Sequence, residues 1–112
     1  LSSDYRTCKD AIGWAARFQF PSIVFYPGNE LKFTIEFWYP RWVDSDAFIK
    51  IAKDALTGII YTDDKLVAED HSIRHIQKGC IIRATITVEE IESAIEISQE
   101  FRSFAVNIIG IE

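Results

Sequence analysis

The residues with the most concentrated potential for chemistry lie between Asp44 and Asp64, a stretch that holds five aspartates. Within it, Asp46, Lys50 and Asp54 recur at four-residue spacing. On a helix this spacing places the three side chains in one stripe along one face. The stretch therefore predicts a row of charged groups presented by a single helix.

Apolar residues occupy the opposite side of the same predicted helix, which we expect to pack on a core. Asp44 lies just before the helix, and Thr57-Gly58 ends it because glycine tolerates the left-handed conformation found at helix C-termini. The chain then continues to Asp63-Asp64, so acidic clusters flank the helix at both ends. The predicted core-facing residues are Phe48, Ile51, Ala52, Ala55 and Leu56.

Carboxylate oxygens are the ligands that Mg2+ prefers, and a few of them usually share the ion with water and a substrate phosphate. Asp44, Asp46 and Asp64 could supply that set, and a metal held there would polarise a phosphoryl oxygen and activate a bound water. Lys50 could neutralise the charge that develops on the phosphate. The alternative interpretation is structural, because aspartates are also favoured at helix N-termini and in turns.

The whole constellation reads Asp-x-Asp, then a lysine one helical turn later, then Asp-Ala-Leu, and finally Asp-Asp after a short loop. This pattern resembles the signature of the RusA family of Holliday junction resolvases. By order of elements the resemblance covers about residues 3–88, and the strong identity lies in the middle. The matching residues are Asp44, Asp46, Lys50, Asp54-Ala55-Leu56 and Asp63-Asp64.

The resemblance implies an Mg2+-dependent endonuclease, with Mn2+ able to substitute, that cuts four-way DNA junctions as a homodimer. A C2 dimer with two sites suits a junction that has two-fold symmetry and needs paired cuts. Lys50 would be the catalytic lysine, with Asp63 as a supporting neighbour and Asp54 bracing the site without touching the metal. The implied metal ligands, which are also catalytic, are Asp44, Asp46 and Asp64.

Two departures from the family pattern bear on activity. Ala47 stands where the family usually has asparagine, which removes a side-chain amide able to form hydrogen bonds near the site. The family also opens with a strand and a basic, proline-rich loop, whereas this chain begins at Leu1-Ser2-Ser3, so we expect a leading segment to be missing. The alternative function is therefore a catalytically impaired domain of the same fold that binds branched DNA or a protein.

The length of 112 residues allows one domain, and a hydrophobic content of 48% is enough for a core. No run of apolar residues approaches the roughly 18 needed to cross a bilayer, and no secretory signal opens the chain. We therefore expect an intracellular protein from the cytoplasm of a bacterium, encoded by the host or by a phage. In that setting Cys8 and Cys80 are expected as free thiols.

The predicted order of elements is helix, strand, helix, strand, strand, helix, which makes an α+β domain with a mixed, mainly antiparallel sheet. The first helix runs over about residues 3–17 and is predicted to bury Phe18 at its end, and residues 31–39 form an alternating strand. Residues 66–77 and 80–88 are predicted to form a hairpin around the tight turn at Lys78-Gly79.

The last segment, about residues 89–109, has apolar residues at helical spacing and is predicted to be an additional C-terminal helix of the single domain 1–112. Its apolar stripe must be covered, either by the sheet of its own chain or by a second copy. The stripe consists of Ala94, Ile97, Phe101, Phe104, Ala105 and Ile108.

Overall charge does not favour nucleic-acid binding, because 12 Lys and Arg stand against 17 Asp and Glu. Residues 89–112, however, hold six glutamates and one arginine, so the preceding part of the chain is balanced. If metal offsets the predicted site, that part has a moderate basic bias. Trp14 and Trp38 are assigned to the core or to an interface, whereas the expected DNA contacts are Arg41, Trp42, Lys53 and Lys65.

Overall fold

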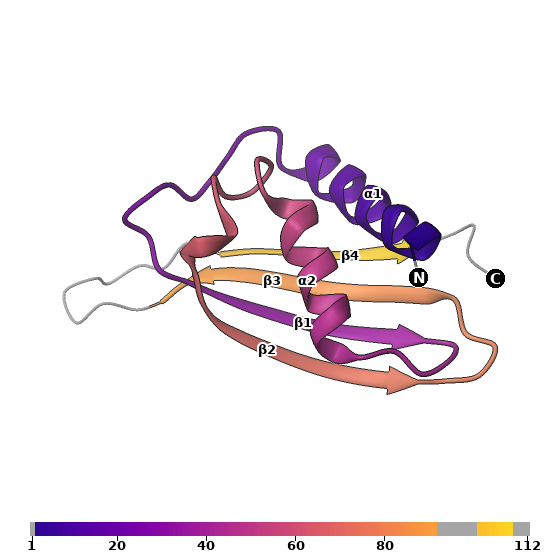
Figure 1. The fold of residues 1–112 in the computed structure, drawn as a ribbon. Helices are drawn as coiled ribbons and strands as arrows, with labels where there is room; N and C mark the ends of the chain where they lie inside the picture. Colours follow the sequence, from indigo (N-terminus) through magenta and orange to yellow (C-terminus); the bar gives the residue numbers. More distant parts are fainter. Residues whose placement is uncertain (1, 92–100, 109–112) are drawn as a thin grey trace.

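The computed structural model describes residues 2–91 and 101–108, which form two helices, a short 3-10 helix and one sheet (Figure 1). In chain order the elements are α1 (Ser2–Gln19), β1 (Leu31–Tyr39), α2 (Ser45–Leu56), η1 (Asp64–Leu66), β2 (Val67–Ile76), β3 (Ile82–Glu90) and β4 (Phe101–Ile108).

The four strands lie in the order β2-β1-β3-β4. β1 pairs with β2 in parallel, while the β1–β3 and β3–β4 pairs are antiparallel. Figure 1 shows α1 and α2 lying over the same face of this sheet. The prediction of an α+β domain with a mixed, mainly antiparallel sheet is confirmed.

The core lies between the helices and the sheet. β1 alternates without interruption between buried and half-buried residues, as its sequence predicts, because successive side chains of a strand point to opposite faces. β3 repeats this pattern beside it. The buried residues of these two strands are Leu31, Phe33, Ile35, Phe37, Tyr39, Ile82, Ala84, Ile86 and Val88.

α2 forms where its caps and its apolar spacing predict. Asp44 is the N-cap residue, and Gly58, just past the end, has φ of 82°. All five residues expected to face the core are buried, and Ile49 is buried with them. Phe48 stacks on Phe37 of β1 with ring centroids 4.3 Å apart, which fixes the helix against the centre of the sheet.

The predicted hairpin between residues 66–77 and 80–88 is wrong. A turn does lie there, with Gly79 at φ of 82°, but β2 and β3 do not pair with each other. Both strands pair with β1, which lies between them, so the connection passes across the end of β1. The parallel β1–β2 pair, joined through α2, is a βαβ unit: α2 returns the chain to the end of the sheet at which β1 begins, so β2 runs parallel to β1 as the edge strand.

The predicted C-terminal helix over residues 89–109 is also wrong within the described residues. β3 extends to Glu90, and Phe101–Ile108 is a strand paired with β3. Phe104, Val106 and Ile108 are buried while Ser103, Ala105 and Asn107 are exposed. Burial therefore alternates with the two-residue period of a strand and not with the period of a helix. The predicted stripe members Ala94 and Ile97 lie outside the described residues.

α1 agrees with its predicted limits to within two residues, but its outer side differs from expectation. Cys8, Ile12 and Ala16 form the buried stripe, one helical turn apart. Phe18, predicted to be buried, is 92% exposed, and Trp14 is 69% exposed and therefore not a core residue.

Among the described residues no helix combines the length and apolar composition that crossing a membrane requires.

Candidate functional site

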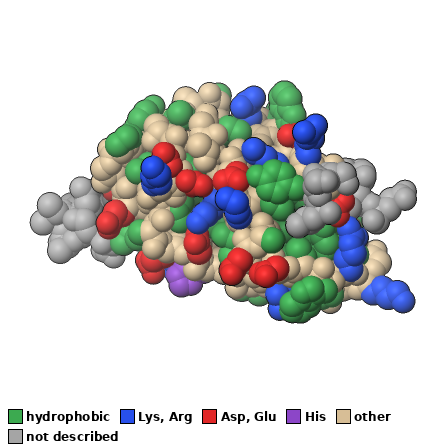
Figure 2. Space-filling view, in the orientation of Figure 1, with side chains coloured by type: hydrophobic (Ala, Val, Ile, Leu, Met, Phe, Trp, Pro, Cys, Tyr) green, Lys and Arg blue, Asp and Glu red, His purple; other side chains and the backbone are tan. Residues whose placement is uncertain are grey.

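A groove of about 450 Å³ runs between α2 and the edge strand β2, on the helix-bearing side of the sheet. It gathers three of the residues that the sequence marks as catalytic, Asp46, Lys50 and Asp64. Figure 2 shows acidic and basic side chains interleaved across this face of the molecule. The full lining is Asp46, Ile49, Lys50, Lys53, Asp64, Asp70 and Ser72.

The start of α2 positions the first two aspartates. Oδ1 of Asp44 accepts a hydrogen bond from the backbone N–H of Asp46 at 2.9 Å, which satisfies a donor that the helix itself leaves free. Asp46 is thereby fixed in the first turn, facing the groove. Asp44 is exposed and acts as the cap, and it is not part of the groove lining.

β2 supplies the opposite wall. Asp70 and Ser72 lie beside the buried Phe33 and Ile35 in the parallel register, so their side chains point to the same face as α2. Arg74 continues this row and donates from Nη1 to Ser45 Oγ at 3.2 Å. The sequence analysis missed Asp70 and Ser72 as site residues, because their two-residue spacing places them on one face of a strand but does not show that this face meets α2.

Asp64 begins η1 at the other end of the groove. Oδ1 of Asp63 accepts from the backbone N–H of Lys65 at 2.9 Å and so caps this short helix. Burial raises the pKa of Asp64, and a hydrogen bond with Asp63 and the charge of Asp54 add to the rise. The positive charge of Lys53 acts in the opposite direction.

Lys53 connects the two walls of the groove. Its Nζ lies 3.2 Å from Oδ2 and 3.3 Å from Oδ1 of Asp70. The backbone carbonyl of Lys53 also accepts a hydrogen bond from the Tyr61 hydroxyl at 2.7 Å. Tyr61 is fully buried, so this bond anchors the last turn of α2 to the core.

Asp54 lies on the side of α2 that faces α1. Its Oδ2 accepts from the hydroxyl of Tyr5 at 2.9 Å and lies 4.0 Å from Nζ of Lys50. Asp54 therefore links Lys50 to Tyr5 of α1, and it does not line the groove itself. The hydrogen bond to Asp54 also raises the pKa of Tyr5.

The three predicted metal ligands do not gather at one point. Within the described ranges, no three His, Cys, Asp or Glu side chains lie close enough together to hold one ion. Asp46 and Lys53 are seven positions apart, about 10 Å along the helix axis, and Asp64 lies at the Lys53 end. The chemistry of the donors fits a hard cation, which needs only one or two protein carboxylates beside a substrate phosphate.

The four expected DNA contacts have different surroundings. Arg41 forms an ion pair with Asp4 at 2.6 Å and is thereby tied to α1. Trp42 is 71% exposed, and the guanidinium carbon of Arg74 lies over its ring, 4.0 Å from the ring centroid. Lys65 is exposed beside Asp64, whereas Lys53 lies within the groove.

The fold and the site together define an α+β domain in which carboxylates and lysines line a groove beside a βαβ unit. The family model described as endodeoxyribonuclease RusA matches residues 1–89. Because this match covers well over half of the chain, the protein belongs to the RusA family of endodeoxyribonucleases. No curated protein matches the chain.

Proposed function

We propose that this protein is a structure-selective endodeoxyribonuclease that resolves Holliday junctions in DNA recombination and repair, in the cytoplasm of a bacterium or of a phage-infected cell. The observation that carries this proposal is the groove, which Asp46, Lys50 and Asp64 all line within the part of the chain that matches the family. A phosphodiester strand lying in the groove would have the ammonium groups of Lys50 and Lys53 on the α2 side and the carboxylate of Asp70 on the β2 side.

We propose that a divalent cation, Mg2+ or Mn2+, binds at the groove with one or two of the carboxylates of Asp44, Asp46 and Asp64 as its protein ligands. Bound there with a substrate phosphate, such an ion would polarise the phosphoryl oxygen and supply an activated water. Oδ1 of Asp44 is used by the helix cap, which leaves Oδ2 as its donor to a cation. Because the three carboxylates do not surround one point, a substrate phosphate and water would supply the remaining ligands.

We assign the stabilisation of developing negative charge to Lys50. Its ammonium group is exposed at the groove and is held within 4.0 Å of Asp54, so it is positioned without being buried. Replacing Lys50 by Ala should lower the cleavage rate about a hundredfold, the loss typical for one preorganised electrostatic contact. Lys78→Ala, in the exposed turn between β2 and β3, is the matched control.

The direct test is cleavage of a labelled four-way junction with Mg2+ and with a chelator. Asp46→Asn should abolish metal-dependent cutting while leaving junction binding unchanged or stronger, because the substitution removes a charge that repels phosphate. Glu69→Gln is the control, since Glu69 lies on the same sheet edge but alternates to the face opposite Asp70. Cutting by Asp46→Asn at the normal rate would refute the assignment.

We also propose that the active form is a homodimer, because two symmetric cuts in one junction require two sites. Sedimentation of the free protein and of its junction complex tests this. Two protein chains on one junction are expected, and a single chain that makes both cuts would contradict the proposal.

A second candidate is a domain that binds branched DNA without cutting it. Two observations favour it, namely the carboxylates that do not gather into one cluster and the half-buried Ala47 in place of the family asparagine. The Ala47→Asn variant separates the two functions. If the natural protein binds junctions without cutting and Ala47→Asn restores cutting, the impaired form is the correct description.

A further inference from the structure

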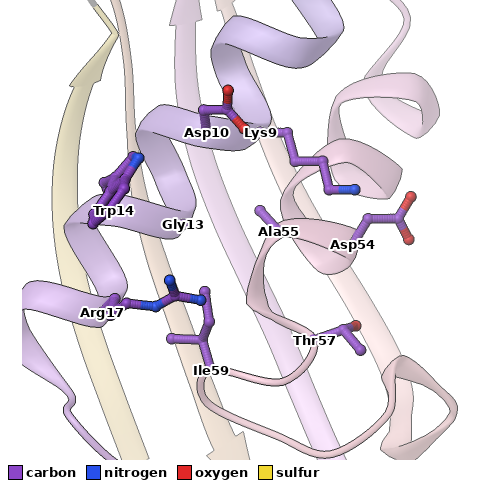
Figure 3. A pocket seen from close by; sticks show the side chains of 9 residues that line it. All are labelled: Lys9, Asp10, Gly13, Trp14, Arg17, Asp54, Ala55, Thr57 and Ile59. Carbon is purple, nitrogen blue, oxygen red and sulfur yellow. The ribbon is translucent and has the colours of Figure 1, made fainter.

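A second pocket, of about 480 Å³, lies on the other flank of α2, between α1 and the turn that follows α2. It faces the same side of the sheet as the candidate nuclease groove, and α2 separates the two. Figure 3 shows the side chains that border it. They are Lys9, Asp10, Gly13, Trp14, Arg17, Asp54, Ala55, Thr57 and Ile59.

One wall of this pocket is an exposed aromatic ring beside a cation. Trp14 is 69% exposed, and the guanidinium carbon of Arg17 lies 5.7 Å from its ring centroid. α1 buries its opposite stripe against the core, so the indole is not needed to hold the helix in place. An exposed indole next to a guanidinium is a surface on which a nucleobase can stack.

The lining holds two carboxylates, Asp10 and Asp54, beside its two cations. Among the described residues, however, neither Lys9 nor Arg17 forms an ion pair, and the ammonium group of Lys9 lies 5.9 Å from the ring centroid of Tyr5. Asp54, the nearest acidic wall of α2, is already engaged by Tyr5 and Lys50. Lys9 and Arg17 are therefore available to an anionic ligand.

The spacing of these cations suits a strand rather than a single anion. Lys9 and Arg17 are eight positions apart, about 12 Å along the axis of α1. Successive phosphates of a stacked DNA strand are only about 3.4 Å apart along its axis. The two cations would thus meet phosphates about three steps apart on a strand, and Trp14 lies between them along the helix axis.

We propose that this pocket binds a short unpaired segment of single-stranded DNA, with one base stacked on Trp14, phosphates on either side of that base at Lys9 and Arg17, and Asp10 accepting from an amino group of a base. The assignment deepens the proposed function, on which it rests for the class of nucleic acid, by adding an unpaired strand to the substrate. Because the pocket and the nuclease groove flank the same helix, one branched DNA could occupy both.

The test measures binding of a short fluorescein-labelled single-stranded oligodeoxynucleotide by anisotropy, with chelator present so that no cleavage occurs. Trp14→Ala is expected to weaken binding about tenfold or more, as loss of one stacked base does, and Trp14→Phe should retain most of the affinity. Phe18→Ala is the control, because Phe18 is 92% exposed on the same helix and outside the pocket lining.

The charge of Arg17 is tested in the same way. Arg17→Gln should weaken binding and flatten its dependence on salt, because one phosphate contact is lost. Arg6→Gln, which removes an exposed charge from the same helix outside the pocket, should do neither. Thermal unfolding of each variant establishes that a loss of binding is not a loss of fold.

The proposal is overturned if Trp14→Ala and Arg17→Gln bind the oligonucleotide as tightly as the natural protein. If these two variants bind the oligonucleotide normally but no longer bind a protein, the pocket is a protein-docking surface and the proposal is also overturned. Asp46→Asn and Asp64→Asn should bind the oligonucleotide normally. Their retained binding would keep this site distinct from the nuclease groove, even if the natural protein cuts no junction.

Discussion

Nζ of Lys53 lies 3.2 Å from Oδ2 of Asp70 and so joins α2 to the edge strand β2 across the candidate nuclease groove. Burial raises the pKa of Asp64, and the positive charge of Lys53 partly offsets that rise. The two ion-pair side chains are 21% and 39% exposed, so the pair contributes little to stability. The main effect of Lys53 is electrostatic, because its single positive charge acts on the negative charges of both Asp70 and Asp64.

Lys53→Met should therefore raise the pKa of Asp64 further, since the positive charge that favours the ionised carboxylate is gone. An NMR titration of the Asp64 side-chain carboxyl carbon measures this. Lys78→Met, in the exposed turn before β3, should leave the titration unchanged. An unchanged or lower pKa of Asp64 in Lys53→Met would show that Lys53 does not act on this carboxylate.

Asp64→Asn should increase stability at neutral pH. The raised pKa means that the folded state holds the proton of Asp64 more tightly than the unfolded chain does, so ionising Asp64 costs stability as the pH rises through its folded value. Asparagine removes that cost. We expect a higher Tm than that of the natural protein at pH 7, and a difference that vanishes below about pH 3, where both states are protonated. A lower Tm at pH 7 would contradict this.

Asp44 has two proposed roles that can be separated. Asp44→Ala should cost about 1 kcal/mol of stability, because the hydrogen bond to the N–H of Asp46 is lost. Asp44→Ser keeps a capping oxygen and should restore stability, but it supplies no carboxylate to a cation. Denaturant unfolding and junction cleavage of both variants are compared. If Asp44→Ser cuts at the natural rate, Asp44 is only a cap.

The two cysteines should differ in reactivity. Burial raises the pKa of Cys8 to about 11, and the thiol is 1% exposed, so little thiolate is present or accessible near pH 8. Cys80 is half-buried and free. A thiol reagent at pH 8 should label Cys80 first and label Cys8 only with unfolding, and equal rates in the folded protein would contradict the packing of α1.

β4 should be an integral part of the core although the family match ends before it. Phe104 is 4% exposed and meets Phe20 edge-to-face with ring centroids 5.9 Å apart. Phe104→Ala should cost about 3–5 kcal/mol, whereas the exposed Phe18→Ala should change stability by less than about 0.5 kcal/mol. Denaturant unfolding compares the two, and a similar small loss for both would mean that β4 adds little.

Local patterns in the sequence were enough to predict α2 and β1. The capping Asp44, the apolar spacing and Gly58 all lie in or next to α2, so they predict this helix without reference to the rest of the chain. The alternation over residues 31–39 likewise predicts a strand with one buried face. The helix alone places Asp46 and Lys50 one turn apart on a common face.

Strand pairing and the wall of the groove depend on distant parts of the chain. Gly79 predicts a turn but does not determine that β1 lies between the strands on either side of it. Phe104 and Ile108 fit a helical period as well as a strand period, and only pairing with β3 selects the strand. Asp70 becomes a site residue because β2 lies beside α2, which no local pattern states.

The most direct test of the central claim is cleavage of a labelled four-way junction, with linear duplex of the same sequence as the reference substrate. The natural protein with Mg2+ should make paired cuts confined to the junction, Glu69→Gln should do the same, and Asp64→Asn or a chelator should abolish cutting. Cutting that persists in Asp64→Asn, or that falls equally on linear duplex, would contradict a junction-resolving site in the groove between α2 and β2.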